Sequence, residues 1–183
     1  ILTPNGNCEV KVSKKGKITV LDRIKRNAAT PVELEHNRKK QYIIPDNEPV
    51  DFLMALGVQD ERGRIFDKKR SKFRQINRFL ELIRDVESNL PAEGVLNIAD
   101  LCCGKSYLSF AVYHYFTAIK GRSVRMVGVD MKAEVMAECD AIARNLGMEG
   151  LSFVCGDVTR YQFPDGAQVH MVISLHACDI ATD

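Results

Sequence analysis

Short apolar runs alternate with helical patterns over the second half of the chain. The runs are nearly continuous, which is typical of strands buried on both faces of a parallel sheet. They cover residues 95–101, 124–129, 151–154 and 169–175. Between the first three runs, apolar residues recur at spacings of three and four, which indicates helices. This alternation of strand and helix predicts an α/β fold with a doubly wound parallel sheet.

The first 64 residues show a different pattern. Residues 9–12 and 17–21 read as two strands around a basic turn, Lys14-Lys15-Gly16. Thr30-Pro31 favours a helix over residues 32–40, and a short helix is expected over 50–56. Residues 59–64 form a charged turn suited to a linker, and a longer helix is expected over 67–88. We therefore expect two domains: a small basic α+β region over residues 1–64 and the sheet domain over residues 65–183.

Charge is distributed unevenly between the two halves. The first 84 residues carry 19 Lys and Arg against 11 Asp and Glu, and the remainder carries 7 against 13. A basic first half favours contact with a polyanion such as RNA, and a merely solvated charged surface is the equal alternative. The basic residues at the start of the 67–88 helix oppose the helix dipole, so they are the candidate phosphate contacts: Lys68, Lys69, Arg70, Lys72 and Arg74.

Composition limits the other classes of function. The chain has 183 residues, and no apolar run approaches the length of a membrane span. No membrane contact and a cytoplasmic location are expected. The six cysteines lack paired C-x-x-C spacing, so we expect reduced thiols and no metal site.

The turn after the first predicted strand, D-L-C-C-G-K-S from residue 100 to 106, leads directly into a helical pattern. A helix start preceded by small residues is suited to binding a phosphate or nucleotide. A P-loop would need glycine where Ala99 stands, and a dinucleotide-binding loop would need more glycines than Gly104. A third interpretation is a D-x-G-x-G-x-G loop in which Cys102 and Ser106 replace the outer glycines. An ordinary strand-to-helix turn is the remaining alternative.

Acidic residues follow three of the predicted strands. They are Asp100, Asp130 and Asp157, and the fourth strand is followed by the segment from His176 to Asp179. Ligands of open parallel sheets bind at the carboxyl ends of the strands, where an acid after the second strand can accept ribose hydroxyls. Each aspartate taken alone is better explained as a helix N-cap than as a ligand contact. Their repetition at successive strand ends favours a binding site.

With this loop and these acids, the chain resembles the class I S-adenosylmethionine-dependent methyltransferases, which have a Rossmann-like sheet. The segment S-L-H-A-C-D-I-A-T-D, residues 174–183, is similar to a branch that includes uncharacterised bacterial methyltransferases and the methyltransferase-like part of glutathione S-transferase C-terminal domain-containing protein. The resemblance implies that S-adenosyl-L-methionine is the cofactor. The positions that it implies as cofactor contacts are Asp100, Cys102, Gly104, Ser106, Asp130, Met131, Asp157 and Val158.

The methyl acceptor is expected near the end of the fourth strand. His176 and Asp179 are the candidate catalytic residues, with His176 as a general base or, alternatively, as a neutral structural histidine. A nucleophilic role for Cys178 is a weaker alternative. RNA is the favoured acceptor because of the basic first half. An alternative function is that of an RNA-binding protein on a methyltransferase-like scaffold with a vestigial cofactor site.

The resemblance also implies a sheet of seven strands, of which this sequence reaches the fourth. We expect a C-terminally truncated fragment in which the fourth strand forms an exposed apolar edge. Such an edge predicts self-association between copies of the chain.

Overall fold

The computed structural model describes residues 2–3, 6–22 and 42–175 of the chain. It divides the chain into two compact units, Ile1–Lys40 and Gln41–Asp183. The boundary expected between residues 64 and 65 therefore lies inside the second unit. The helix expected over residues 32–40 lies outside the described residues.

The first unit contains an antiparallel sheet in the order β1-β2-β3. Its strands are β1 (Leu2–Thr3), β2 (Gly6–Val12) and β3 (Ile18–Asp22). The predicted hairpin is confirmed. Gly16 adopts a φ of 76° in the turn, and the backbone N–H of Lys17 donates to the Ser13 hydroxyl over 3.0 Å.

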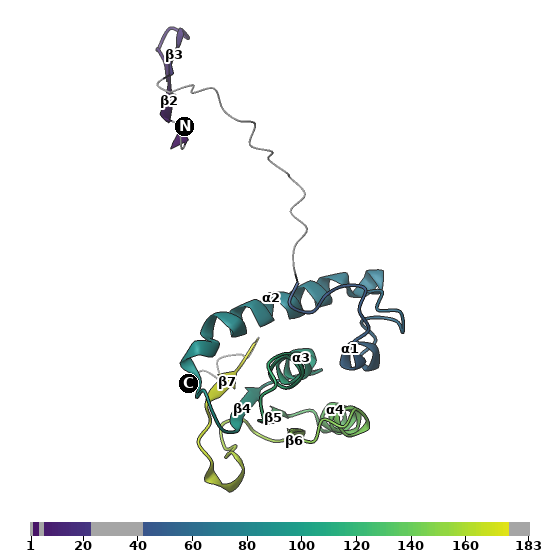
Figure 1. Ribbon diagram of the computed structural model, residues 1–183. Helices are drawn as coiled ribbons and strands as arrows, with labels where there is room; N and C mark the ends of the chain where they lie inside the picture. Colours follow the sequence, from purple (N-terminus) through teal and green to yellow (C-terminus); the bar gives the residue numbers. More distant parts are fainter. Residues whose placement is uncertain (1, 4–5, 23–41, 176–183) are drawn as a thin grey trace. The chain divides into compact units, whose positions relative to one another are not determined.

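The second unit is built on a parallel sheet in the order β6-β5-β4-β7 (Figure 1). Its strands are β4 (Leu96–Leu101), β5 (Val124–Asp130), β6 (Leu151–Cys155) and β7 (Met171–Ile173). This arrangement confirms the expected fold class. Chain order runs outward from β4 through β5 to β6 and then returns to β7 on the other side of β4. The carboxyl ends of β4 and β7 therefore flank a topological switch point, where α/β proteins bind ligands.

One face of the sheet carries the main hydrophobic core. Ile98 and Met126 point into it, while their neighbours Ala99 and Val127 belong to a separate cluster on the opposite face, as the alternation of a strand requires. Figure 1 shows α2 and α3 on the same side of the sheet. The helices of the second unit are α1 (Asp51–Ala55), α2 (Arg70–Val86), α3 (Tyr107–His114) and α4 (Ala133–Asn145). A π-helical turn, Tyr115–Ile119, extends α3, and 3₁₀ turns Asp67–Lys69 and Glu87–Asn89 flank α2.

The long helix expected over residues 67–88 is observed as α2, and apolar residues at helical spacing face the core. Phe73, Ile76, Leu80 and Ile83 are buried, whereas Val86 is 45% exposed because the α-helix ends there. Asn77 is also buried, and its side-chain oxygen accepts the backbone N–H of Ile44 over 2.8 Å. This bond ties the segment before α1 to α2.

The opposite face of the sheet has thinner cover. Among the described residues, its buried apolar cluster consists of Ala99, Val127, Val129 and Phe163. The segment after β6 supplies this cover, including a 3₁₀ turn at Pro164–Gly166, and Val158 packs against the cluster.

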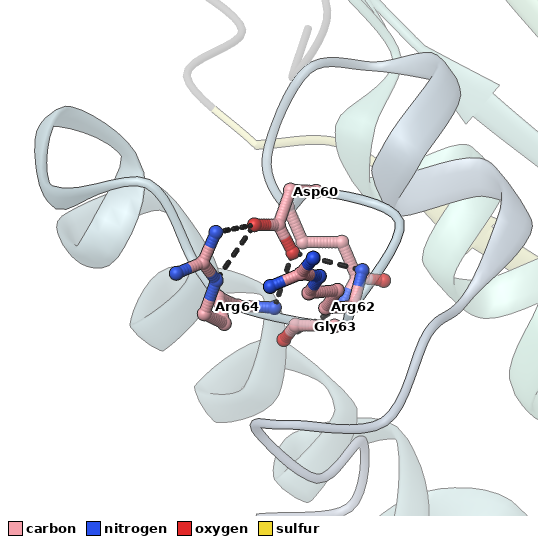
Figure 2. A network of polar contacts seen from close by, with 5 residues as sticks. Asp60, Arg62, Gly63 and Arg64 are labelled. Carbon is pink, nitrogen blue, oxygen red and sulfur yellow. Dashed lines mark hydrogen bonds and ion pairs between the residues drawn. The ribbon is translucent and has the colours of Figure 1, made fainter.

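The charged turn before α2 is a hydrogen-bonded structure (Figure 2). One Asp60 carboxylate oxygen accepts the backbone N–H groups of Arg62 and Arg64, each over 2.9 Å, and the other accepts the Arg64 guanidinium. Gln59 is 2% exposed, and its side-chain oxygen accepts the Val50 backbone N–H over 2.6 Å. These bonds fix residues 59–64 against α1, although the sequence suggested a linker there.

Among the described strands, β7 pairs with β4 alone, and Val172 on it is 59% exposed. Self-association through this strand stays a prediction. None of the helices in the described ranges is long and apolar enough to span a bilayer.

Candidate functional site

The loop between β4 and α3 has an unusual backbone path. Cys102, Gly104 and Ser106 adopt φ values of 59°, 53° and 55°, so every second residue is left-handed. These are the positions of the three glycines in a D-x-G-x-G-x-G loop. A left-handed conformation costs a non-glycine residue roughly 1–2 kcal/mol. The loop therefore keeps a glycine-type path although two of its glycines are replaced.

Relief of this strain is measurable. Cys102→Gly should raise the free energy of unfolding by up to about 1 kcal/mol, because glycine adopts the left-handed conformation without steric cost but loses more backbone entropy. The control is Cys155→Gly in β6, where glycine should lower stability. Urea unfolding of both variants checks the expectation. A Cys102→Gly protein that is destabilised as much as the control would contradict it.

Asp130, at the end of β5, holds this loop in place. Its Oδ2 accepts the backbone N–H of Gly104 over 2.9 Å, and its Oδ1 accepts the N–H of Lys132 over 3.1 Å. The N–H of Cys103 also donates to the carbonyl of Val129 over 3.2 Å. The sequence predicted that Asp130 contacts a ligand. It did not reveal the hydrogen bond between Gly104 and Asp130, because the spacing of residues along the chain does not indicate that contact.

The space above Gly104 is open. A Cβ atom built on this residue would meet no atom within 4 Å outside its immediate neighbours. Asp130 is partly exposed beside it, and each of its carboxylate oxygens retains a further lone pair for a ligand hydroxyl. A ligand can therefore approach the Gly104 backbone while reaching Asp130.

Asp100 lies beneath the loop. Its side chain is 3% exposed, and its Oδ2 accepts a hydrogen bond of 2.5 Å from the Ser109 hydroxyl on α3. The pKa of Asp100 is raised from 3.8 to about 7, mainly by burial; the Ser109 hydrogen bond opposes this shift, and the charge of Asp130 adds to it. The carboxyl group thus joins β4 to α3 from the inside.

The Cys103 thiol is not activated. Burial raises the pKa of Cys103 to about 12, and its Sγ lies 3.7 Å from the Met136 Sδ. Ser106 is 2% exposed and donates its hydroxyl to the Gly104 carbonyl over 3.3 Å. Cys103 is therefore a neutral packing residue, and Ser106 stabilises the turn from within.

Asp157 and its neighbours follow β6. Asp157 accepts the Thr159 backbone N–H over 3.0 Å and the Thr159 hydroxyl over 2.7 Å, and these bonds lower the pKa of its exposed carboxyl group. Met131, after β5, is 76% exposed, and its carbonyl accepts the Cys155 thiol over 3.4 Å. Both segments lie at the carboxyl ends of neighbouring strands, as the sequence predicted.

The five basic residues at the start of α2 separate into two groups. Lys69 and Lys72 are partly buried beside the loop, whereas Lys68, Arg70 and Arg74 are exposed. Arg70 pairs with Asp67 over 3.0 Å. The structure thus brings two of the five residues to the candidate site.

The predicted catalytic residues His176 and Asp179, with Cys178, lie outside the described residues. The first and fourth predicted strands are neighbours, since β4 and β7 pair in parallel. The Ser174 hydroxyl donates to the Leu101 carbonyl over 3.3 Å at that point. In the described part of the chain, no cluster of three or more His, Cys, Asp or Glu side chains could hold a metal ion.

A parallel sheet in this order, with a left-handed loop after β4 and an acid at the end of β5, defines a Rossmann-like α/β protein of the class I methyltransferase type. A family model described as a methyltransferase domain matches residues 71–183, which is more than half of the chain. The chain belongs to that family. No curated protein matches it in sequence.

Solved structures that this chain resembles span several proteins. YjhP from E. coli is 16% identical, with a TM-score of 0.42 over 73% of this chain and 46% of that one. A protein-L-isoaspartate O-methyltransferase is 17% identical, with a TM-score of 0.41 over 55% and 28%. A Trypanosoma brucei PRMT1 enzyme–prozyme complex with AdoHcy is 25% identical, with a TM-score of 0.35 over 44% and 23%. The chain therefore spans less than half the length of each.

Proposed function

We propose that this chain is the cofactor-binding part of an S-adenosylmethionine-dependent methyltransferase. The observation that carries the proposal is the left-handed loop after β4, which is open above Gly104 and bonded to Asp130 at the end of the adjacent strand. A loop of this shape lets a ligand touch backbone while a carboxylate binds its hydroxyl groups.

The resemblance to class I methyltransferases implies which residues of this chain would contact the cofactor. The amino-acid end would lie over Gly104, between Cys102 and Ser106, and the ribose would lie against Asp130, next to Met131. Asp157 and Val158 would flank the adenine, and Asp100 would position the loop from beneath. When bound, S-adenosylmethionine supplies a methyl group on a sulfonium. The protein residues bind and orient the two reactants for an in-line displacement.

RNA is the proposed acceptor, and the basic residues at the start of α2 support it. His176 and Asp179 are the proposed catalytic residues, and membership of the branch with the L-H-A-C-D segment is part of the same proposal. Incubation with methyl-tritiated S-adenosylmethionine tests the acceptor. Label in cellular RNA supports it, and label found only in protein contradicts it.

The cofactor site itself is tested by Asp130→Ala. The variant should bind S-adenosylmethionine more weakly by about 1–3 kcal/mol, because it loses charge-assisted hydrogen bonds to the ligand and the bond that fixes Gly104. Isothermal titration calorimetry measures the loss. Asp165→Ala is the matched control, since Asp165 is exposed and pairs with Arg125.

Affinity that is unchanged by Asp130→Ala would remove this residue from the site. A parent protein that binds RNA but no S-adenosylmethionine would favour the alternative function, an RNA-binding protein on a methyltransferase-like scaffold.

A further inference from the structure

A cavity of about 460 Å³ lies between the start of α2, the loop after β4 and the end of β7. Its size falls in the range of roughly 300–1,000 Å³ that is usual for ligand sites. Leu175 lines it, so it lies on the side of the loop that faces the proposed acceptor position rather than toward Asp130 and β6.

Two lysines of α2 and its preceding turn converge on one aromatic ring in this cavity. The Lys69 ammonium donates to the Tyr107 hydroxyl over 3.1 Å and lies 5.4 Å from the centre of the Tyr107 ring. The Lys72 ammonium lies 5.2 Å from the same ring centre and donates to the Gln75 side-chain oxygen over 2.7 Å. The ring and the polar atoms fix both ammonium groups, but they do not neutralise them.

The lining of the cavity is positively charged. Lys105 lines it with Lys69 and Lys72, and none of the described residues that line it is an Asp or Glu. A neighbouring cavity of about 220 Å³, between α1 and α4, differs because Glu138 lines it together with Lys105. Ammonium groups that have no carboxylate partner beside them bind oxyanions favourably.

The positive charge of the cavity also favours the methyl acceptor over the cofactor as the ligand that binds there. S-adenosylmethionine carries an ammonium, a carboxylate and a sulfonium, so its net charge is positive. Three lysines repel such a molecule as a whole, whereas they attract the backbone of a nucleic acid.

We propose that Lys69, Lys72 and Lys105 bind a phosphate group of the methyl acceptor in this cavity. The inference rests on the proposed function for the identity of the acceptor. The proposal assigns phosphate contact to only some of the basic residues predicted at the start of α2. Arg70 and Arg74 line a different pocket, which Asp46 also lines, and they are not part of this site.

The test compares two double variants of the 183-residue protein. Lys69→Gln with Lys72→Gln removes two charges from the cavity. Arg78→Gln with Arg84→Gln removes two charges from exposed positions of the same helix that do not line it. The probe is a fluorescein-labelled single-stranded RNA of about ten nucleotides, a length that covers a typical single-strand site, measured by anisotropy at several salt concentrations. Calorimetry with S-adenosylmethionine is run on the same proteins.

The lysine variant should lose RNA affinity by about tenfold or more, and the slope of log affinity against log salt should fall by about 1 to 2. Its affinity for S-adenosylmethionine should be unchanged, and the arginine variant should lose about twofold or less. Lys105→Gln, a change at an exposed position, should weaken RNA binding in the same direction and serves if the double variant does not fold.

Three results would overturn the inference. The first is an equal loss of RNA affinity in both double variants, and the second is no RNA binding by the parent protein. The third is a lysine variant that loses affinity for S-adenosylmethionine alone, which would assign the lysines to the cofactor carboxylate. If the lysine variant loses RNA affinity as expected but the parent protein binds no S-adenosylmethionine, the phosphate site is supported and the methyltransferase proposal is rejected. The two failures are therefore distinguishable.

Discussion

Replacing Asp100 with asparagine is expected to remove most of the pH dependence of stability between about pH 4 and pH 7. Burial raises the pKa of this carboxyl group from 3.8 to about 7 in the folded protein. Across that interval the folded chain holds a proton that the unfolded chain has lost, so stability falls as pH rises. The difference between pKa values of 3.8 and about 7 corresponds to roughly 4 kcal/mol in the free energy of unfolding. Asparagine is neutral and keeps an oxygen for Ser109, so the variant should exceed the parent in stability at about pH 8.

Urea unfolding at about pH 5 and pH 8 measures this difference. Asp157→Asn is the control, because the Asp157 carboxyl group is exposed and hydrogen bonds lower its pKa, so the control should keep the decline of the parent. Equal slopes in the parent and Asp100→Asn would show that the buried carboxyl group does not titrate in this range.

Gly150→Ala is expected to lower the free energy of unfolding by more than about 3 kcal/mol. Gly150 directly precedes β6, and a Cβ atom on it would lie 2.1 Å from the backbone carbonyl oxygen of Val124. Its own carbonyl accepts the Met126 N–H over 2.7 Å, so the clash falls where β6 meets β5. Neither backbone can move without disturbing this pairing.

Gly156→Ala is a matched control at the other end of β6. A Cβ atom there would meet its nearest neighbour, Val129 Cγ1, at an ordinary 3.9 Å. Thermal and urea unfolding should show a change within about 1 kcal/mol for this variant. If the two alanine variants were equally stable, close backbone contact at Gly150 would not limit the fold.

The sheet could be predicted from the sequence because its strands are apolar runs that end at polar residues. The order of the strands agrees with the resemblance to class I methyltransferases, and the pairing of Asp100 with Gly128 and of Asp130 with Cys155 places both acids at one edge. Periodicity alone specifies which face of α2 is buried, with Val86 as the exception.

The features that the sequence did not reveal depend on contacts between residues far apart in the chain. Cys102 and Ser106 carry side chains that disfavour a left-handed conformation, yet both adopt it, in a turn that Asp130 holds through Gly104. Residues 42–65 carry too short a pattern to show that Ile44 and Phe52 join the core. The separation of Lys69 and Lys72 from Arg70 and Arg74 follows helical spacing, so a helical wheel would have indicated it.

The two faces of the central sheet are held by unequal packing, and this inequality sets an order of local opening. Segment 156–170 contributes few buried side chains, so its amides should exchange with solvent at free energies well below that of global unfolding. Asp157 and Val158 belong to this segment, whereas Gly104 lies between β4 and α3, next to the main core. At the proposed cofactor site, S-adenosylmethionine would therefore be held rigidly at its amino-acid end and enclosed at its adenine end by the part of the fold that opens most readily.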